Sequence, residues 1–270
     1  MGFNKFMITI KNKQEIKVLR EGGKILASIL YKIAEEVKPG ITTADLEKMA
    51  CDLIKAAGGR PSFKGYQSLL DDKPFPTAFC ASINDEVVHA PALPARILED
   101  GDIIGLDLGM EYPYKKNKNG YYTDMAITLG VGKIDKEAAE LIAVTKESLE
   151  LAIKKIKPGN TINDIGRTVQ QFAESKGFAV VRELVGHGVG YDVHEDPRVP
   201  NYEISEKSLE NAILKPGMVI AVEPMVNRGG WKVKTGSDDF TILTADESLS
   251  AHFEHTVAVT DEGHLVITEL

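Results

Sequence analysis

The chain has little cysteine and no long apolar run. Its 270 residues include only two cysteines, Cys51 and Cys80, and neither belongs to a CxxC pair. A disulfide framework is therefore not expected, and both side chains are predicted to be reduced thiols. Residues 1–13 mix Lys and Asn with apolar side chains, so neither a signal peptide nor a membrane span is predicted there. These absences indicate a soluble, cytoplasmic protein.

Positive charge is also scarce. The chain carries 32 Lys and Arg against 40 Asp and Glu, a formal net charge of −8. Because binding to a phosphate backbone needs clustered Lys and Arg, nucleic acid is not expected as the main partner. The one basic cluster, Lys115, Lys116 and Lys118, is small and is predicted to lie in a loop. Hydrophobic residues make up 43% of the chain, which is enough to bury a sizeable core.

The chain does contain an internal repeat. Residues 37–46 and 156–165 both read apolar-Lys-Pro-Gly-x-Thr-x-x-Asp-apolar. Each follows a run of apolar residues at helical spacing. Pro-Gly is typical of the end of one helix, and the Thr is typical of the start of the next. The repeat therefore predicts four helices, at Ile25–Glu36, Thr43–Ala57, Ala138–Lys155 and Ile162–Lys176.

The repeat continues into apolar strands. Residues 97–107 resemble residues 213–223, and each segment predicts a turn followed by a strand that ends on a carboxylate. A second carboxylate follows in each half within a β-rich run. The four carboxylates are Asp107 and Asp124 in the first half and Glu223 and Glu254 in the second.

Two helices followed by antiparallel strands in each half predict an α+β fold. Each half alone would leave an apolar sheet face exposed, and joining the halves would bury both faces. We therefore expect one pseudo-symmetric domain over residues 1–270, with halves at about 13–130 and 135–265.

The four carboxylates indicate a metal site. One carboxylate in a buried strand is ordinarily explained by a salt bridge or a backbone hydrogen bond. Four at equivalent places in a repeat would repel one another, and a shared divalent cation would resolve that conflict. Two metals about 3.5–4 Å apart are a recurring hydrolytic arrangement. A nitrogen ligand would favour a transition metal, and His187 in the glycine-rich segment 185–190 is the candidate.

Together these segments resemble the type I methionine aminopeptidases of the pita-bread fold. The resemblance runs from about Lys13 to the end of the chain and implies a pseudo-two-fold repeat of helix pairs on a curved antiparallel sheet. The matching segments are Ser82–His89, Gly101–Asp107, Thr123–Asp124, Gly186–Gly190, His194–Pro197, Gly217–Pro224 and Ser248–Thr256.

The resemblance also implies roles for particular residues. Two divalent ions (Co, Mn, Fe or Zn) would be held by Asp107, Asp124, His187, Glu223 and Glu254. His89, His194 and Glu223 would be catalytic, with His89 and His194 also contacting the substrate. The pocket for the substrate methionine would be lined by Phe63, Tyr66, Phe75, Cys80, Val193 and Trp231.

The implied activity is removal of the N-terminal methionine from nascent proteins with a small second residue, through attack of a metal-activated hydroxide on the scissile carbonyl. The implied partners are nascent polypeptide N-termini near the ribosome, with no membrane and no direct nucleic-acid site. A monomer is expected. The chain also lacks the zinc-binding or Lys-rich N-terminal extension of some relatives.

Two segments depart from the family pattern. Asp107 and Asp124 lie 17 positions apart, farther than is common in relatives, and the extra residues fall around 111–119. If the two aspartates lie opposite each other, the turn centres on Lys115 and Lys116. A longer loop is then expected, with Gly120 as a bend or bulge. A second insertion is expected around 235–243.

Two other functions remain open. An X-Pro aminopeptidase or prolidase of the same fold would use the same five metal ligands, although the spacing from Gly186 to His194 and the block at residues 248–255 favour the methionine enzymes. A non-catalytic pita-bread binding protein would have lost metal ligands, and here all five are present.

Overall fold

Helices and strands follow one another in the order that the repeat predicts. The computed structural model describes residues 7–67 and 73–270, so the expectation for residues 1–6 lies outside the described part. The described residues contain four α-helices, α1 Lys13–Glu35, α2 Thr43–Ala56, α3 Lys136–Ile153 and α4 Ile162–Ser175. The predictions for α2, α3 and α4 are confirmed to within two residues at each end.

Helix α1 begins twelve residues earlier than predicted. Asn12 caps it, because its side chain accepts hydrogen bonds from the amides of Gln14 and Glu15, at 2.9 and 3.1 Å. The Glu15 carboxylate in turn accepts from the Asn12 amide at 2.7 Å. This reciprocal capping box satisfies amides that would otherwise lack a partner at the start of a helix.

The strands form one large sheet and two small ones. They are β1 Arg60–Pro61, β2 Phe79–Ile83, β3 Glu86–Val88, β4 Ile103–Tyr112, β5 Tyr121–Gly130, β6 Ala179–Val180, β7 Gly186–Gly188, β8 Glu195–Val199, β9 Val219–Val222, β10 Met225–Asn227, β11 Val233–Thr235, β12 Ile242–Thr244, β13 Ser250–His252, β14 Glu254–Val259 and β15 His264–Val266. The nine-stranded sheet has the order β1-β4-β5-β14-β9-β7-β8, with β2 on β4 and β15 on β14. The small sheets are β13-β10-β6 and β11-β12-β3.

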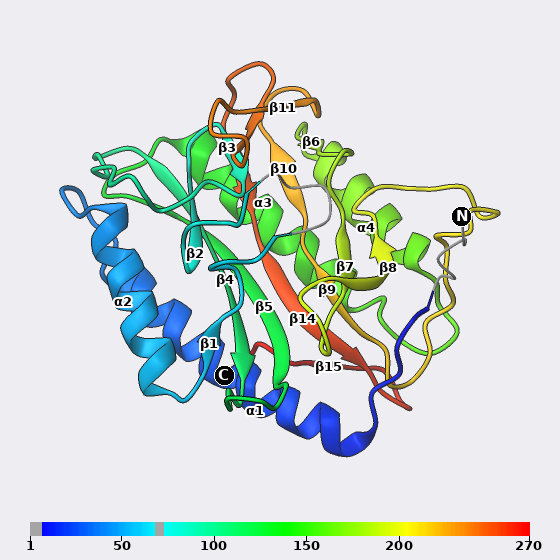
Figure 1. The fold of residues 1–270 in the computed structure, drawn as a ribbon. Helices are drawn as coiled ribbons and strands as arrows, with labels where there is room; N and C mark the ends of the chain where they lie inside the picture. Colours follow the sequence, from blue (N-terminus) through cyan, green and yellow to red (C-terminus); the bar gives the residue numbers. More distant parts are fainter. Residues whose placement is uncertain (1–6, 68–72) are drawn as a thin grey trace.

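The helix pairs pack against one face of the large sheet (Figure 1). In the first half, Leu26 of α1 and Leu46 of α2 share a buried core with Leu106 and Leu108 of β4. A second core joins α3 and α4 to β9, β13 and β14. Because strand side chains alternate between faces, residues between the core positions, such as Asp107, point away from the helices. The predicted α+β pita-bread architecture is confirmed.

The repeat is visible in matching contacts. The Thr42 amide donates to Asp45 at 3.1 Å, and the Thr161 amide donates to Asp164 at 2.8 Å. Thr42 bridges to Ile97, and Thr161 bridges to Ile213. Gly40 and Gly159, which precede these caps, have φ of 90° and 88°. Glycine adopts this left-handed conformation without the strain that a side chain brings.

The two halves meet where β5 pairs with β14. Two threonines fasten this seam from opposite sides. The Thr256 hydroxyl accepts from the Asp124 amide at 2.9 Å and donates to the Asp124 carbonyl at 2.8 Å. The Thr128 hydroxyl makes the same two bonds with the backbone of His252, at 2.9 and 2.8 Å.

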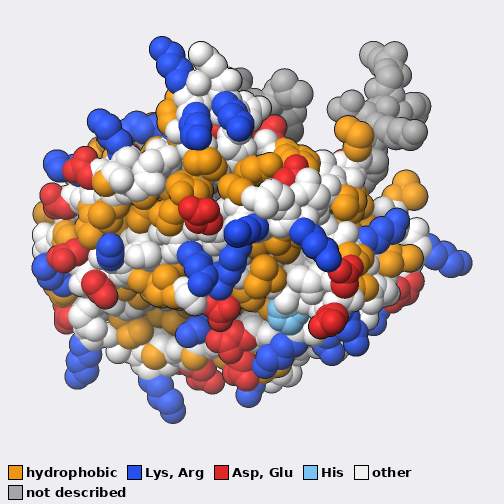
Figure 2. All heavy atoms as spheres, turned by 90° about the horizontal axis from the view of Figure 1, so that it is seen from below, with side chains coloured by type: hydrophobic (Ala, Val, Ile, Leu, Met, Phe, Trp, Pro, Cys, Tyr) orange, Lys and Arg blue, Asp and Glu red, His pale blue; other side chains and the backbone are white. Residues whose placement is uncertain are grey.

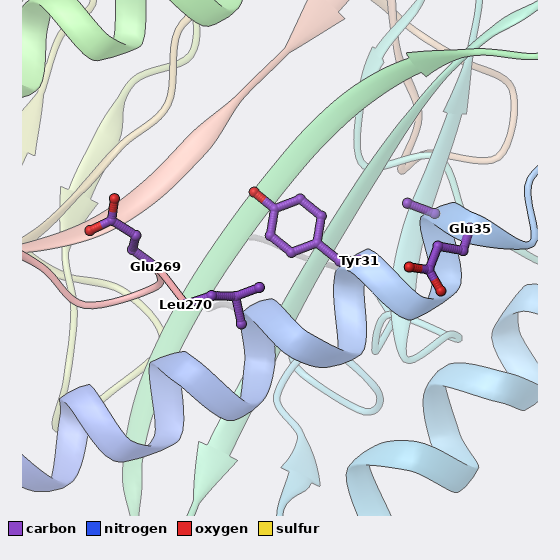
Figure 3. Close-up of a pocket in the computed structure, with 5 residues that line it drawn as sticks. Tyr31, Glu35, Glu269 and Leu270 are labelled. Carbon is purple, nitrogen blue, oxygen red and sulfur yellow. The ribbon is translucent and has the colours of Figure 1, made fainter.

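The C-terminal residues lie along α1. Arg20 donates to the Ile267 carbonyl at 2.9 Å. A Cβ atom on Gly23 would lie 2.3 Å from that same carbonyl oxygen, so only glycine allows this approach. Glu269 and Leu270 end beside Tyr31 and border a shallow hollow (Figure 3).

The lower face of the molecule is mixed in charge. Figure 2 shows Lys and Arg side chains interspersed with Asp and Glu across this face. No continuous basic surface of the kind that phosphate backbones require is visible there among the described residues. Of the four helices that the structure describes, none combines the length and the apolar character needed to cross a bilayer.

Candidate active site

Two cavities formed by residues that the structure describes have room for a small ligand. The hollow in Figure 3 has a volume of about 660 Å³, but it is lined only by Tyr31, Ala34, Glu35, Glu269 and Leu270. A second cavity of about 520 Å³ opens on the side of the large sheet away from the helices. All five predicted metal ligands line this second cavity, together with His89 and His194. The chemistry therefore belongs to the second cavity.

Strand register brings three of the carboxylates together. Ala126 of β5 pairs with Asp107 of β4 on one side and with Glu254 of β14 on the other. Asp124 lies two residues before Ala126 and so shares its face of the sheet. Glu223 follows directly after β9, which pairs with β14. Three neighbouring strands and the end of a fourth thus present carboxylates to one space.

Two details of the predicted strands are wrong. Strand β4 does not end at Asp107 but continues to Tyr112, because residues 108–112 go on pairing with β5. Asp124 pairs with Gly109 and therefore lies diagonal to Asp107, not opposite it. A longer loop is present, but it spans residues 113–120, because Glu111 and Tyr112 belong to β4. Its tight turn is held by the Lys118 amide, which donates to the Lys115 carbonyl at 3.0 Å.

The carboxylate cluster is buried, which disfavours the charged form of each carboxyl group. Asp107, Asp124 and Glu254 are 9%, 5% and 3% exposed. Burial raises the pKa of Asp124 to about 7. Burial, followed by repulsion from the charge of Asp124, raises the pKa values of Asp107, Glu223 and Glu254 well above their ordinary range. Like charges are thus held together where little water reaches them.

The cluster has free ligand atoms. Asp107 Oδ1 and Glu254 Oε1 are buried and have no hydrogen-bond partner. One potential ligand atom from each of Asp124, His187 and Glu254 lies within 4.8 Å of the others. Buried carboxylate oxygens without partners, beside an imidazole, fit divalent transition metals. The residues present therefore suit the metals that the sequence predicts.

Strand β7 leaves no room for a side chain on either residue next to His187. A Cβ atom on Gly186 would lie 2.4 Å from the Ala221 carbonyl oxygen, and one on Gly188 would lie 2.2 Å from that of Asp196. His187 Nδ1 lies 2.8 Å from the Gly188 carbonyl, to which it can donate in the neutral ring. Burial, followed by the neighbouring His194, lowers the pKa of His187 to about 3. A neutral ring with Nδ1 as donor presents Nε2 as a lone pair, and this atom lies 3.5 Å from Glu223 Oε1.

Two further histidines border the same space. The rings of His194 and His187 have centroids 4.4 Å apart. His194 Nδ1 lies 2.8 Å from the Tyr66 hydroxyl, which fixes the orientation of the ring. His89 has φ of 60°, and the backbone beyond it returns to β2, where the Ala81 amide donates to the Ala90 carbonyl at 2.8 Å.

The apolar wall of the cavity differs in part from the prediction. Phe63, Tyr66, Phe75 and Cys80 line the cavity, whereas Val193 and Trp231 are not among its lining residues. Trp231 instead lies against Arg182, whose guanidinium carbon is 5.2 Å from the ring centroid.

Phe240 also lines the cavity, although the sequence analysis did not predict it. It lies in the predicted 235–243 insertion, which forms the turn of the β11–β12 hairpin. Its ring meets that of Phe75 edge-on at 5.4 Å. The hairpin reaches the cavity because β12 pairs with β3. The sequence signal that could have identified Phe240 is an aromatic residue inside the predicted insertion.

His252 was also missed. It is 3% exposed, and its Nε2 has no hydrogen-bond partner and lies 3.9 Å from Glu223 Oε2. Burial, followed by the neighbouring His89, lowers the pKa of His252 to about 3. It is a second neutral imidazole beside the carboxylates.

Comparison with known proteins agrees with this site. The model of metallopeptidase family M24 matches residues 17–261. The methionine aminopeptidase of Clostridium acetobutylicum is 45% identical over 262 residues, which cover 97% of this chain and 99% of that one. The Escherichia coli methionine aminopeptidase is 37% identical over 262 residues, covering 97% and 94%.

Solved structures agree as well. The crystal structure of the methionine aminopeptidase from Thermotoga maritima has a TM-score of 0.89 at 38% identity, covering 98% of this chain and 100% of that one. The prolidase from Pyrococcus horikoshii has a TM-score of 0.71 at 22% identity and is covered over 63% of its length, so it shares the fold alone. The chain therefore belongs to metallopeptidase family M24 and, within it, to the methionine aminopeptidases.

Proposed function

We propose that this enzyme removes the initiator methionine from newly made proteins whose second residue is small. The observation that supports this most directly is the joining of a buried cluster of carboxylates and imidazoles to a cavity walled by Phe63, Phe75 and Phe240. A linear thioether side chain fits an apolar, aromatic wall of this kind. The substrates would be N-termini of nascent polypeptides in the cytoplasm near the ribosome, and the enzyme would act as a monomer.

We infer that the cluster holds two divalent ions, of Co, Mn, Fe or Zn, bound by Asp107, Asp124, His187, Glu223 and Glu254. Asp124 and Glu254, which lie on the neighbouring strands β5 and β14, would be among the residues that hold them. Such ions would lower the pKa of a bound water and polarise the carbonyl after methionine.

Residues of the chain would supply the rest of the chemistry. Glu223 would take a proton from the attacking water and deliver it to the leaving amine. His194 would donate a hydrogen bond to the carbonyl oxygen as negative charge develops there, and His89 would contact the scissile amide.

Peptide cleavage tests the proposal. The protein is reconstituted with Mn²⁺ or Co²⁺, and free Met is measured from Met-Gly- and Met-Lys-initiated peptides, beside cleavage of a Gly-Pro-initiated peptide. Met release from Met-Gly- but not from Met-Lys- is expected. Glu223→Ala should abolish it, whereas Glu262→Ala, which changes an exposed carboxylate, should not. Cleavage of the Gly-Pro- peptide alone would assign the chain to the proline peptidases instead.

A further inference from the structure

Residues 7–12 lie against the loop that carries His194. The Met7 amide donates to Asp196 Oδ2 at 3.0 Å. The Lys11 amide donates to the Gly217 carbonyl at 2.8 Å. The segment that precedes α1 is thus fastened at both ends to the second half of the molecule, far away in sequence.

A buried ion pair lies in the middle of this contact. Lys11 Nζ is 2.7 Å from Glu195 Oε2, and the two side chains are 1% and 8% exposed. The Lys11 ammonium also donates to the Thr9 hydroxyl, which in turn donates to Glu195. It lies 5.0 Å from the centre of the Tyr191 ring. A buried charge is costly when it loses its partner, so this pair keeps Lys11 and Glu195 in a fixed relation.

Glu195 joins two segments through its two oxygens. Oε2 faces Lys11 and Thr9, whereas Oε1 accepts hydrogen bonds from the amides of Tyr191 and Asp192, the latter at 3.0 Å. At Gly190 an added Cβ would lie 2.6 Å from Lys11 Cε. The conformation of residues 190–195 therefore depends on where Lys11 lies.

The same loop carries His194. Glu195 is the next residue and pairs with Gly188 of β7, directly after His187. The His194 ring is held on its far side by the Tyr66 hydroxyl at 2.8 Å. Glu195 follows His194 directly in the chain, and the ion pair with Lys11 holds Glu195 in place.

We propose that Lys11 is a positioning residue for the peptidase reaction, acting through the Glu195 carboxylate to hold the 190–195 loop so that His194 faces the scissile carbonyl. The inference rests on the proposed role of His194. Lys11 is not among the residues that line the cavity, so its loss should lower turnover without altering metal binding. A displacement of about 1 Å at a reacting group can cost on the order of a hundredfold in rate.

Lys11→Met tests this, because Met keeps an unbranched side chain as far as Cε and removes the charged ammonium. Lys13→Met is the matched control, since the pair of Lys13 with Asp261 is 93% and 71% exposed. With a Met-Gly- peptide we expect Lys11→Met to lower kcat by roughly ten- to a hundredfold, with KM within about twofold. Lys13→Met should leave both at wild-type values. Mn²⁺ affinity, measured by calorimetry, should not change in either variant.

The His194→Ala background separates positioning from general damage. If Lys11 acts through His194, adding Lys11→Met to His194→Ala should lower kcat no further. An equal loss in both backgrounds would overturn the inference, and so would wild-type kcat in Lys11→Met.

Should Lys11→Met not fold, Thr9→Val keeps both charges and removes one hydroxyl. It should lower kcat a few-fold with KM unchanged, and wild-type kcat there would overturn the inference. An inactive wild type would instead refute the proposed function itself.

Discussion

Replacing Asp124 by Asn should stabilise the metal-free protein at alkaline pH. Burial raises the pKa of Asp124 to about 7 from an ordinary value of 3.8. Well below pH 3.8 the carboxyl is protonated in both the folded and the unfolded chain. As the pH rises toward 7 the unfolded chain ionises first, so the folded state loses stability across that interval. Asn does not ionise and keeps an oxygen to accept from the Met125 amide, which Asp124 Oδ1 does at 3.0 Å.

The rise in pKa lowers the free energy of unfolding of the wild type by on the order of 4 kcal/mol at pH 8. For a chain of this length that free energy is equivalent to about 7 °C in Tm. Only the difference between the two proteins isolates this effect. The buried rings of His187 and His252, whose pKa values are lowered to about 3, stabilise the folded state increasingly as the pH rises toward 6.5, but they are common to both proteins.

Thermal unfolding in the presence of a chelator would measure this difference. At pH 4 the two proteins should unfold at nearly the same temperature, and at pH 8 the Asn variant should unfold at a higher temperature. Mn²⁺ at a hundred times Kd should add about 2.7 kcal/mol to the free energy of unfolding of the wild type alone, and so raise its Tm. Equal Tm values at pH 8 without metal would refute the reasoning that ionisation of buried Asp124 destabilises the folded, metal-free protein.

Three other substitutions test the site and the fold. His194→Ala should lower kcat by roughly a hundred- to a thousandfold, with Mn²⁺ affinity unchanged by calorimetry. Phe240→Ala should lower kcat/KM for Met-Gly- peptides about tenfold through loss of aromatic packing, whereas Trp231→Ala, outside the cavity wall, should stay within about twofold. Gly23→Ala should destabilise the protein by about 1–3 kcal/mol in urea unfolding, because its Cβ meets a backbone carbonyl. Gly105→Ala, whose nearest contact would be 3.6 Å away, should cost less than half of that.

Patterns set by local chemistry were readable from the sequence. The Thr-x-x-Asp signals at Thr42 and Thr161 predict the starts of α2 and α4, because the side chains that cap a helix lie next to it in the chain. The repeat also predicts which four carboxylates meet. The capping box at Asn12 was equally readable but was overlooked.

Features that depend on distant contacts were not readable in the same way. Asp124 lies diagonal to Asp107 because the register of β4 and β5 is set over ten residue pairs, and the repeat alone does not fix it. Phe240 reaches the cavity only because β12 pairs with β3, more than 150 positions earlier. Lys11 and Glu195 are separated by 184 positions, and nothing in the sequence near either residue indicates that the two are paired.

Because the proposed metal ligands come from both halves, a bound metal would join the two halves as well as take part in the reaction. β5 and β14 pair through only two residues on each strand at the seam, and the two threonine bridges flank that pairing. Asp107 and Asp124 approach from one side, and His187, Glu223 and Glu254 from the other. If the chain were nicked between β5 and α3, neither fragment would hold a complete ligand set. Reassembly of the two fragments would then depend on divalent metal, and a chelator would separate them.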